Sequence, residues 1–366
     1  MQKRTHISSS HAEPASRIWH LQLCTPHSSV TFLQYFTLLL GLTLIASGNQ
    51  SLADGAGSKV VLYTSADQEF AQGIVASFTA KTGIRVAARY DTEATKTLGL
   101  VQRLRHEARR PQADVFWSSE IFETIRLANE GLLASYESET LADWPTQLRD
   151  QQGRWYGFAL RGRVIGYNRN RVDAKDVPAS IEDLLQQRWK GRLVMARPQF
   201  GTTRGHVAAM LTHYGPQRYR TIIDGLKANQ VTLASGNSSA VRMVAEGRAD
   251  ICLTDTDDVW VAQRNNWPVG LVYPMHGKSG TLLIPNTVAL VKDSPHPAHA
   301  ATLLEFLLSA EVEEMLAMSD SHNLPIREHL AARFPQYAVK NPMIIDYAQV
   351  ASNVNDAVRI ATKGLE

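Results

Sequence analysis

The chain has 366 residues, of which 44% are hydrophobic and 20% are charged, and its formal net charge is +3. This composition is typical of a folded protein with enough apolar residues for two cores, and it excludes an intrinsically disordered chain. The small net charge gives no electrostatic reason to expect binding to nucleic acid or to an anionic membrane surface.

An apolar run near the N-terminus, residues 32–48, has the character of the hydrophobic part of a signal peptide. Small residues follow it, so we expect cleavage after Ala53 and export across the inner membrane. The run is short for a membrane span and contains Thr37 and Thr43, which makes an uncleaved anchor the less favoured alternative. The basic residues that precede it lie far away, which favours a true start codon further along the chain.

Removal of residues 1–53 lowers the formal charge from +3 to +1, because it takes away Lys3, Arg4, Arg17 and Glu13. It also removes Cys24, so the mature chain cannot form an intrachain disulfide. The remaining cysteine, Cys252, stands in an apolar run, which favours a buried and unreactive thiol.

Strand-like and helix-like segments alternate from Lys59 onward, and Gly83 and Gly131 follow two of the helices as stop signals. The patterns predict strands at 60–63, 84–90 and 113–117, and helices at 67–81, 97–107 and 120–130. This alternation is typical of a doubly wound parallel sheet with helices on its faces.

Two long extended stretches without a helix, 155–167 and 282–291, interrupt this alternation. Between them we predict strands at 193–196, 231–234 and 251–253, and helices at 181–187, 203–214, 216–228, 238–246 and 257–264. Helices dominate from residue 298 to the end. We therefore expect an α/β protein with two lobes joined by hinge strands, lobe one covering 54–160 with 283–366 and lobe two covering 161–282.

A small polar loop follows five of these strands and leads into a helix. In open α/β sheets ligands bind at this edge, because free amide groups and helix dipoles converge there. Taken singly, each Ser or Thr is an ordinary helix cap. Five such loops in one chain predict a shared cleft formed by residues 64–67, 118–120, 200–203, 235–239 and 254–258.

The last of these loops, Thr254 to Asp258, carries three carboxylates and two hydroxyl groups. One or two side-chain oxygens already satisfy the free amides of a first helical turn, so the surplus points to a binding site. The alternative is that the helix dipole alone favours aspartate at this position.

The charges in the loops favour two kinds of ligand. A hard metal ion bound together with a small oxyanion satisfies both, and no His or Cys pair with zinc spacing occurs in the loops. For Arg161 and Arg163 the alternative is a salt bridge across the lobes. The predicted ligand or metal-binding residues are Asp67, Glu120, Asp257 and Asp258, and the predicted anion or substrate-binding residues are Ser65, Ser119, Arg161, Arg163, Thr202, Thr203, Asn237, Ser238, Thr254 and Thr256.

From about residue 59 to about residue 327 the chain resembles the periplasmic solute-binding proteins of ferric-iron ABC transporters. The resemblance rests on LYTSADQEF, FTAKTGIRV, ADVFWSSEIF, GFALRGRVIGYN, RWKGRLVMARPQFGTT, LTDTDDVW and IPNTVALVKDSPHPAHAATLLEFLLS. It implies the two-lobed type 2 periplasmic-binding-protein fold, a location in the periplasm, and an inner-membrane ABC permease with its ATPase as partners. It also implies ferric iron (Fe3+) as cargo, with carbonate, phosphate or citrate as an accompanying anion.

Within this resemblance Asp67 stands where members have a His or another ligand, and Ser119 or Glu120 stands near a ligating Glu. The loop 201–203 matches the loop that holds the anion, and Asn237 matches a further anion contact. Adjacent tyrosines that bind iron in many members fall at about Asp257 and Asp258, which is the main departure of this sequence from the family pattern. Carboxylates are weaker donors than tyrosinate but are still hard, anionic and oxygen-based, so they are compatible with ferric iron.

The same cleft is also compatible with other functions. The same transport role with a small organic, phosphorylated or cationic solute, such as a polyamine or a thiamine-like compound, is the first alternative, and a sensor domain is another. A secreted enzyme is remote, because the chain has no G-x-S-x-G, Walker or H-E-x-x-H motif and no His in the five loops. We therefore expect a monomeric binding protein that has no catalytic residue, no catalytic cofactor and no nucleic acid partner, with His206 packed or solvated rather than acting as a base.

Overall fold

The computed structural model describes residues 58–91 and 96–366. The predicted signal peptide, residues 1–53, lies outside them. In the described part of the chain, no helix combines the length and the apolar character that crossing a membrane requires.

The first parallel set of strands is the one predicted from the alternation near the N-terminus. Strand β1 (Lys59–Thr64) pairs in parallel with β2 (Arg85–Tyr90) and with β3 (Val115–Ser118). The helices that follow these strands are α1 (Gln68–Thr82), α2 (Leu98–His106) and α3 (Phe122–Asn129). Helix α1 buries Ala71, Ile74 and Phe78, which share one face at helical spacing.

A second parallel set repeats the pattern further along the chain. Strand β6 (Leu193–Ala196) lies between β7 (Thr232–Ala234) and β8 (Ile251–Asp255), and both pairings are parallel. The helices after these strands are α4 (Gly201–Ala228), α5 (Asn237–Ala245) and α6 (Thr256–Arg264). The predicted break between two helices is confirmed at Gly215, whose φ of 73° and ψ of 167° interrupt α4 just before Pro216.

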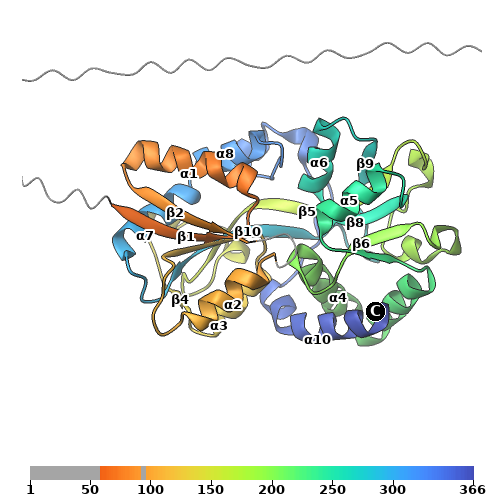
Figure 1. Ribbon diagram of the computed structural model, residues 1–366, viewed down its shortest axis with the longest axis horizontal. Helices are drawn as coiled ribbons and strands as arrows, with labels where there is room; N and C mark the ends of the chain where they lie inside the picture. The colour runs from red at the N-terminus through yellow and green to blue at the C-terminus, as the bar shows by residue number, and fades with distance from the viewer. Residues whose placement is uncertain (1–57, 92–95) are drawn as a thin grey trace, which may run out of the picture. The chain divides into compact units, whose positions relative to one another are not determined.

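Two long strands, β5 (Tyr156–Asn168) and β10 (Leu283–Val291), join the two parallel sets. Strand β10 is antiparallel to β3 and to β5, and β5 is antiparallel to β8. The strand order is therefore β2-β1-β3-β10-β5-β8-β6-β7, and Figure 1 shows β10 and β5 in the middle. The short strands β4 (Leu133–Ala134) and β9 (Val269–Val272), which the sequence patterns do not predict, pair with β10 and β5.

Strand β5 brings two arginines to one face. Its register with β10 shifts between Pro285 and Asn286, opposite Ala159, which has a φ of 46°. Such a bulge twists a strand locally and changes where the following side chains point. Arg161 and Arg163 come directly after it and, being two residues apart, share one face of the strand.

The remaining helices are α7 (Pro297–Leu307), α8 (Ala310–Met318), α9 (Glu328–Ala331) and α10 (Tyr347–Leu365). Helix α10 packs chiefly along α4 and also touches α3, as Figure 1 shows. The Tyr347 and Phe122 rings lie 6.0 Å apart. The C-terminal helix therefore contacts segments on both sides of the two long strands.

The core forms around both parallel sets. One cluster includes Val60, Trp117, Phe158 and Leu303, and another gathers Val164, Val194, Val241, Cys252 and Val259. Cys252 is buried as predicted, and burial raises the pKa of its thiol well above the ordinary value.

The predicted helix at 181–187 is wrong. The segment forms 3-10 turns instead, at Glu182–Leu185 and Gln187–Trp189. Ile181 and Leu184 are buried at a spacing of three residues, which suits a 3-10 turn as well as an α-helix. Further 3-10 turns occur at Glu139–Leu141, Thr146–Leu148, Ala174–Asp176 and Pro335–Tyr337.

Candidate functional site

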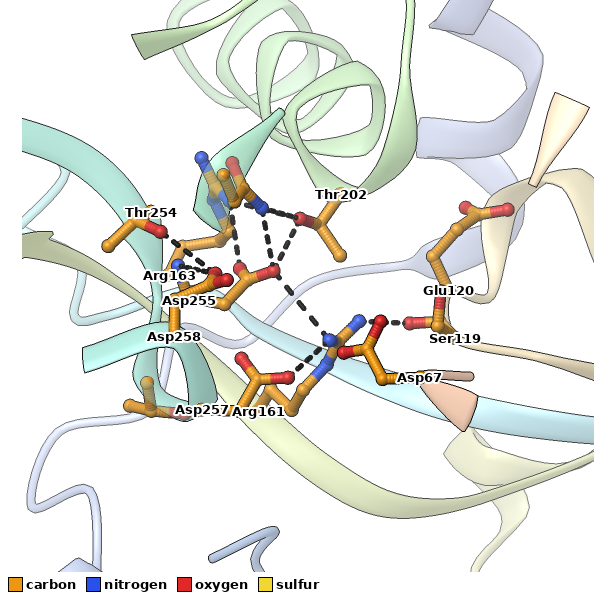
Figure 2. A network of polar contacts seen from close by, with 12 residues as sticks. Asp67, Ser119, Glu120, Arg161, Arg163, Thr202, Thr254, Asp255, Asp257 and Asp258 are labelled. Carbon is orange, nitrogen blue, oxygen red and sulfur yellow. Dashed lines mark hydrogen bonds and ion pairs between the residues drawn. The ribbon is translucent and has the colours of Figure 1, made fainter. Parts of the chain in front are cut away.

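All five predicted polar loops lie between a strand and a helix, and each contributes to the wall of one cavity. A water-sized sphere can occupy only about 20 Å³ of it, about enough for one small ion or one water. Figure 2 shows the polar network at its centre. The lining residues are Asp67, Lys96, Ser119, Arg161, Ala196, Phe200, Gly201, Thr202, Gly236, Asn237, Asp255, Asp257 and Asp258.

Asp255, the last residue of β8, accepts hydrogen bonds from three side chains. Its Oδ1 accepts from Arg163 Nη1 at 2.8 Å, and its Oδ2 accepts from Asn237 Nδ2 at 3.0 Å and from the Thr202 hydroxyl. Burial opposes ionisation, but the charges of Arg163 and Arg161 hold the pKa of Asp255 below its ordinary value. Asp255 is therefore a fixed anion whose orientation three elements determine.

Asp257 is bound on one side only. Arg161 Nη1 donates to its Oδ2 at 2.6 Å, whereas its Oδ1 is buried and has no hydrogen-bond partner. Burial raises the pKa of Asp257, and the negative charges of Asp255 and Asp67 add to this against the effect of Arg161. A buried acceptor without a partner is costly, so this oxygen is a place where a cation would gain a ligand.

Asp258 closes the N-terminus of α6. Its Oδ2 accepts from the Thr254 hydroxyl at 2.9 Å and from the Asp255 amide at 3.4 Å, and its Oδ1 accepts from the Ser238 hydroxyl at 3.0 Å. Asp255 and Asp258 form a capping box. Asp258 therefore caps the helix and also lines the cavity.

The opposite wall comes from β1, β3 and the start of α2. Lys96 Nζ lies 2.6 Å from Asp67 Oδ1, and the Asp67 side chain is 42% exposed. The Ser119 carbonyl accepts a hydrogen bond from Arg161 Nη2, and the Lys96 carbonyl accepts one from the Gly201 amide at 3.3 Å. These contacts join the two predicted lobes directly across the cavity.

Of the predicted site residues, the structure places Asp67, Ser119, Arg161, Thr202, Asn237, Asp257 and Asp258 on the cavity wall. The others, all within the described part of the chain, do not line it: Ser65, Glu120, Arg163, Thr203, Ser238, Thr254 and Thr256. Most of these support the wall, because they hydrogen-bond to residues or loops that form it.

The supporting contacts are specific. The Ser65 hydroxyl accepts from the Ser119 amide at 2.9 Å. The Thr203 hydroxyl donates to Asn237 Oδ1 at 3.1 Å, and the Thr256 hydroxyl accepts from the Gly162 amide at 3.2 Å. Arg163 pairs with Asp255 and Arg161 with Asp257, so both ion pairs lie within predicted lobe two and are not the salt bridge across the lobes that was the alternative.

Glu120 does not have the position expected of a cation ligand. Its carboxyl oxygens accept from the amides of Phe122 at 2.8 Å and Glu123 at 3.0 Å, at the start of α3. Burial and the neighbouring Glu123 carboxylate raise the pKa of Glu120 to about 8. Figure 2 shows its carboxyl group turned away from the three aspartates, so it serves as a helix cap.

The sequence reasoning missed Asp255 and Lys96 as wall residues. Asp255 was counted within its loop but not as a ligand, although it is the residue at which β8 ends. Lys96 precedes α2 at a sixth strand-to-helix connection, between β2 and α2. The expectation that polar loops at the carboxyl ends of strands form the cleft, applied to this connection as well, would have included Lys96.

The donor set suits a hard cation. One oxygen each from Asp255, Asp257 and Asp258 can lie within 4.8 Å of one another, a spacing that could hold a metal ion. The carboxylates on the wall, with Asp67, outnumber the cationic side chains Lys96 and Arg161. The N-termini of α4 and α5 also reach the cavity, and their free amides favour an anion.

A larger cavity of about 290 Å³ shares Asp67, Asp257 and Asp258 with the small one. Its other walls come mainly from α1, α5 and α6 and include Phe70, Val241 and Val261. A ligand larger than an ion therefore has room next to the three shared carboxylates.

Residues 111–353 match a family model described as bacterial extracellular solute-binding protein. The chain is 28% identical over 303 residues to iron uptake protein A1 of Synechocystis sp., covering 78% of this chain and 82% of that protein. It is 24% identical over 331 residues to the Fe(3+)-binding periplasmic protein of Serratia marcescens, covering 89% and 93%.

Among solved structures, iron-bound HitA from Pseudomonas aeruginosa superposes with a TM-score of 0.72 at 28% identity, covering 82% of this chain and 98% of that one. This similarity confirms the predicted fold class. It also agrees with the resemblance stated from the sequence alone.

Proposed function

The chain belongs to the family of bacterial extracellular solute-binding proteins, and on that premise we propose that it captures ferric iron in the periplasm for an ABC permease of the inner membrane. The choice of ferric iron as cargo rests mainly on one observation. Asp257 Oδ1 is buried without a partner on a cavity whose other carboxylate ligands are Asp67, Asp255 and Asp258. The names of the relatives, which describe iron uptake and Fe(3+) binding, support the same choice.

The cargo is expected to bind between two lobes that close on it. Lobe one would cover 54–160 with 283–366, and lobe two would cover 161–282. Asp67 and Ser119 belong to the first, and the three aspartates of the β8–α6 junction belong to the second. A ligand favours closure only as far as it binds the closed form better, so contacts from both lobes are required. Arg204 Nε, 2.8 Å from Glu123 Oε1, is a further contact between them.

An accompanying anion has a place in this scheme. Thr202, Asn237 and Lys96 and the N-termini of α4 and α5 favour carbonate or phosphate beside the cation. Citrate would need the adjoining cavity of about 290 Å³. Lys96 and Arg161 cancel part of the negative charge of the four wall carboxylates, and the anion balances the part of the trivalent charge that is then left over.

The ligands set the colour of the complex. Tyrosinate bound to ferric iron gives a coloured complex, and no tyrosine lines the described cavity. We therefore expect tight ferric binding without a phenolate charge-transfer band in the visible spectrum. A strong visible band would mean that a tyrosine from elsewhere reaches the metal.

The test is a titration of the purified protein with ferric citrate, followed by tryptophan fluorescence and calorimetry, with divalent metals, phosphate esters and polyamines as competitors. Replacing Asp257 and Asp258 together with Asn should abolish the ferric response and leave the circular dichroism spectrum unchanged. A response to an organic, phosphorylated or cationic solute but not to ferric ion would replace the iron assignment while keeping the transport role. Turnover of any solute would favour a secreted enzyme and would contradict our proposal of binding and delivery.

A further inference from the structure

Two buried histidines lie next to the site but outside its cavity. His206 is on α4 and His276 lies in the segment between β9 and β10, and they are 1% and 0% exposed. Their Nε2 atoms are 2.8 Å apart. Nothing in the capture of a cation by the carboxylates uses this pair.

The pair continues the hydrogen bonds that begin at Asp255. Arg163, which holds Asp255, also has its Nε 3.3 Å from His206 Nδ1. At the other end, His276 Nδ1 lies 3.1 Å from the Gly280 carbonyl. A single chain of contacts therefore runs from Asp255 at the cavity to the segment that leads into β10.

Only one arrangement of protons satisfies every contact. The Arg163 Nε–H can only donate, so His206 Nδ1 must accept and the proton of this ring lies on Nε2. His206 Nε2–H then donates to His276 Nε2, and the remaining proton of His276 lies on Nδ1, where it donates to the Gly280 carbonyl. Both imidazoles are therefore neutral and each has a defined tautomer.

We infer that His206 and His276 are positioning residues that hold Arg163 on Asp255, and that cargo binding weakens when either imidazole takes up a proton. This inference rests on the proposed function, because it assigns a pH response to the same site. An added proton on His276 Nε2 would set two N–H groups against each other, and one on His206 Nδ1 would face the Arg163 Nε–H. Either event would also place a second positive charge close to Arg163.

The surroundings favour the neutral pair. Burial lowers the pKa of His206 well below its ordinary value, with the charge of Arg163 and the proximity of His276 adding to the effect. Burial also lowers the pKa of His276 to about 4, although the Gly280 carbonyl and Glu182 oppose this and His213 and Arg163 add to it. Tyr214 is a further titratable group beside His276, at a ring distance of 6.5 Å. The chain of contacts is thus intact at neutral pH and fails as the pH falls toward 4.

The far end of the chain is well anchored. The Leu282 carbonyl accepts from the Arg163 amide at 2.9 Å, and the Thr281 amide donates to the Asn341 carbonyl at 2.8 Å. His213 Nε2 also lies 2.9 Å from the His276 carbonyl. The histidines therefore connect Arg163 to a fixed segment.

The first experiment needs no cargo. Nitrogen-15 spectra of the imidazoles at pH 7.5 should show His206 protonated on Nε2 and His276 protonated on Nδ1, with assignment by His206→Asn and His276→Gln. Other tautomers, or a charged ring, would overturn the inference whether or not the protein binds iron. Failure of the wild-type protein to bind ferric citrate would instead defeat the proposed function, and these spectra would still decide whether the pair exists.

The second experiment measures ferric citrate affinity against pH. His206→Leu removes the acceptor of a charged donor and should weaken binding about tenfold or more at pH 7.5. His206→Asn keeps an acceptor that does not titrate, so it should bind within about threefold of wild type and also serves if the Leu variant does not fold.

His276→Gln should match wild type at pH 7.5 and bind about twofold more tightly than wild type at pH 4, where a group with a pKa of about 4 is half protonated. Protonation of the aspartates affects both proteins and cancels in this ratio. His329→Gln, an exposed position on α9, is the matched control and should follow wild type throughout. A folded His206→Leu variant with unchanged affinity, or a constant ratio for His276→Gln, would overturn the inference.

Discussion

The two walls of the cavity are built differently. At the β8–α6 junction Asp255 and Asp258 each accept several hydrogen bonds, and Arg163 behind them is fully buried. At the β1–α1 junction Asp67 is 42% exposed and its Oδ1 pairs with Lys96. One wall is organised in advance by buried ion pairs, whereas the other presents a carboxylate that solvent still reaches.

We expect the two walls to contribute to binding in different ways. Groups fixed before a ligand arrives bind it at little cost in conformational entropy, and they set which ion is accepted. A partly exposed group gains more of its value when closure removes water from around it. We expect the β8–α6 wall to determine affinity and stability, and the Asp67 wall to contribute mainly through closure.

The largest effect should come from removing the buried partner of Asp255. Arg163→Met leaves the Asp255 carboxylate buried with Arg161 3.8 Å away as its nearest remaining cation. Breaking a buried ion pair in this way costs about 3–5 kcal/mol in the free energy of unfolding. Denaturation in guanidinium chloride, followed by circular dichroism, measures this change.

Two further variants test the cause. Adding Asp255→Asn to Arg163→Met should recover part of the lost stability, because no uncompensated charge remains. Arg359→Met, which breaks an exposed pair with Asp356, should leave the unfolding midpoint unchanged. A loss below about 1 kcal/mol for Arg163→Met would show that the β8–α6 wall does not depend on its buried arginine.

The contrast between the walls also shows where sequence reasoning succeeds. Each of the five polar loops lies at a strand end, so its place in the fold follows from the alternation of strands and helices alone. The same rule applied without exception would have included Lys96. The prediction of one shared cleft needed only that the carboxyl ends of strands collect polar loops.

The direction of individual side chains could not be predicted this way. Glu120 and Asp67 both follow a strand in a polar loop, yet Glu120 turns back to cap α3 while Asp67 faces the cavity. The direction of each side chain depends on its surroundings, namely the residues packed around Glu120 and, for Asp67, Lys96. These surroundings belong to elements distant in the sequence. The pairing of Arg163 with Asp255 likewise depends on β5 lying antiparallel to β8, a contact between residues 92 positions apart.

The next effect concerns cargo rather than folding. Asp257→Asn removes the charge beside the unpartnered Oδ1 and should weaken ferric citrate binding about ten- to hundredfold, the loss of one charged ligand in a buried site. Stability at neutral pH should fall by less than in Arg163→Met, because burial already raises the pKa of Asp257 and disfavours its charged form, and Arg161 keeps Asp255 3.8 Å away as a counter-charge. Calorimetric titration at pH 7.5 and thermal unfolding measure the two quantities, with Asp356→Asn on the exposed face of α10 as control. If ferric citrate affinity and protein stability both fell strongly, the carboxylate would act mainly as the structural partner of Arg161.

The smallest effect should come from Asp67→Asn on the opposite wall. Its side chain is 42% exposed, so solvent screens its charge, and the loss of affinity should stay below about tenfold with no change in the unfolding midpoint. Because Asp67 is expected to act after the lobes meet, the dissociation rate of ferric citrate should change more than the association rate, which stopped-flow tryptophan fluorescence separates. Asp67→Asn and Asp257→Asn would have equal effects if both walls were organised alike in the open protein. That result would remove the distinction between a wall that is fixed in advance and one that acts on closure, because exposure would then no longer predict how much a carboxylate contributes.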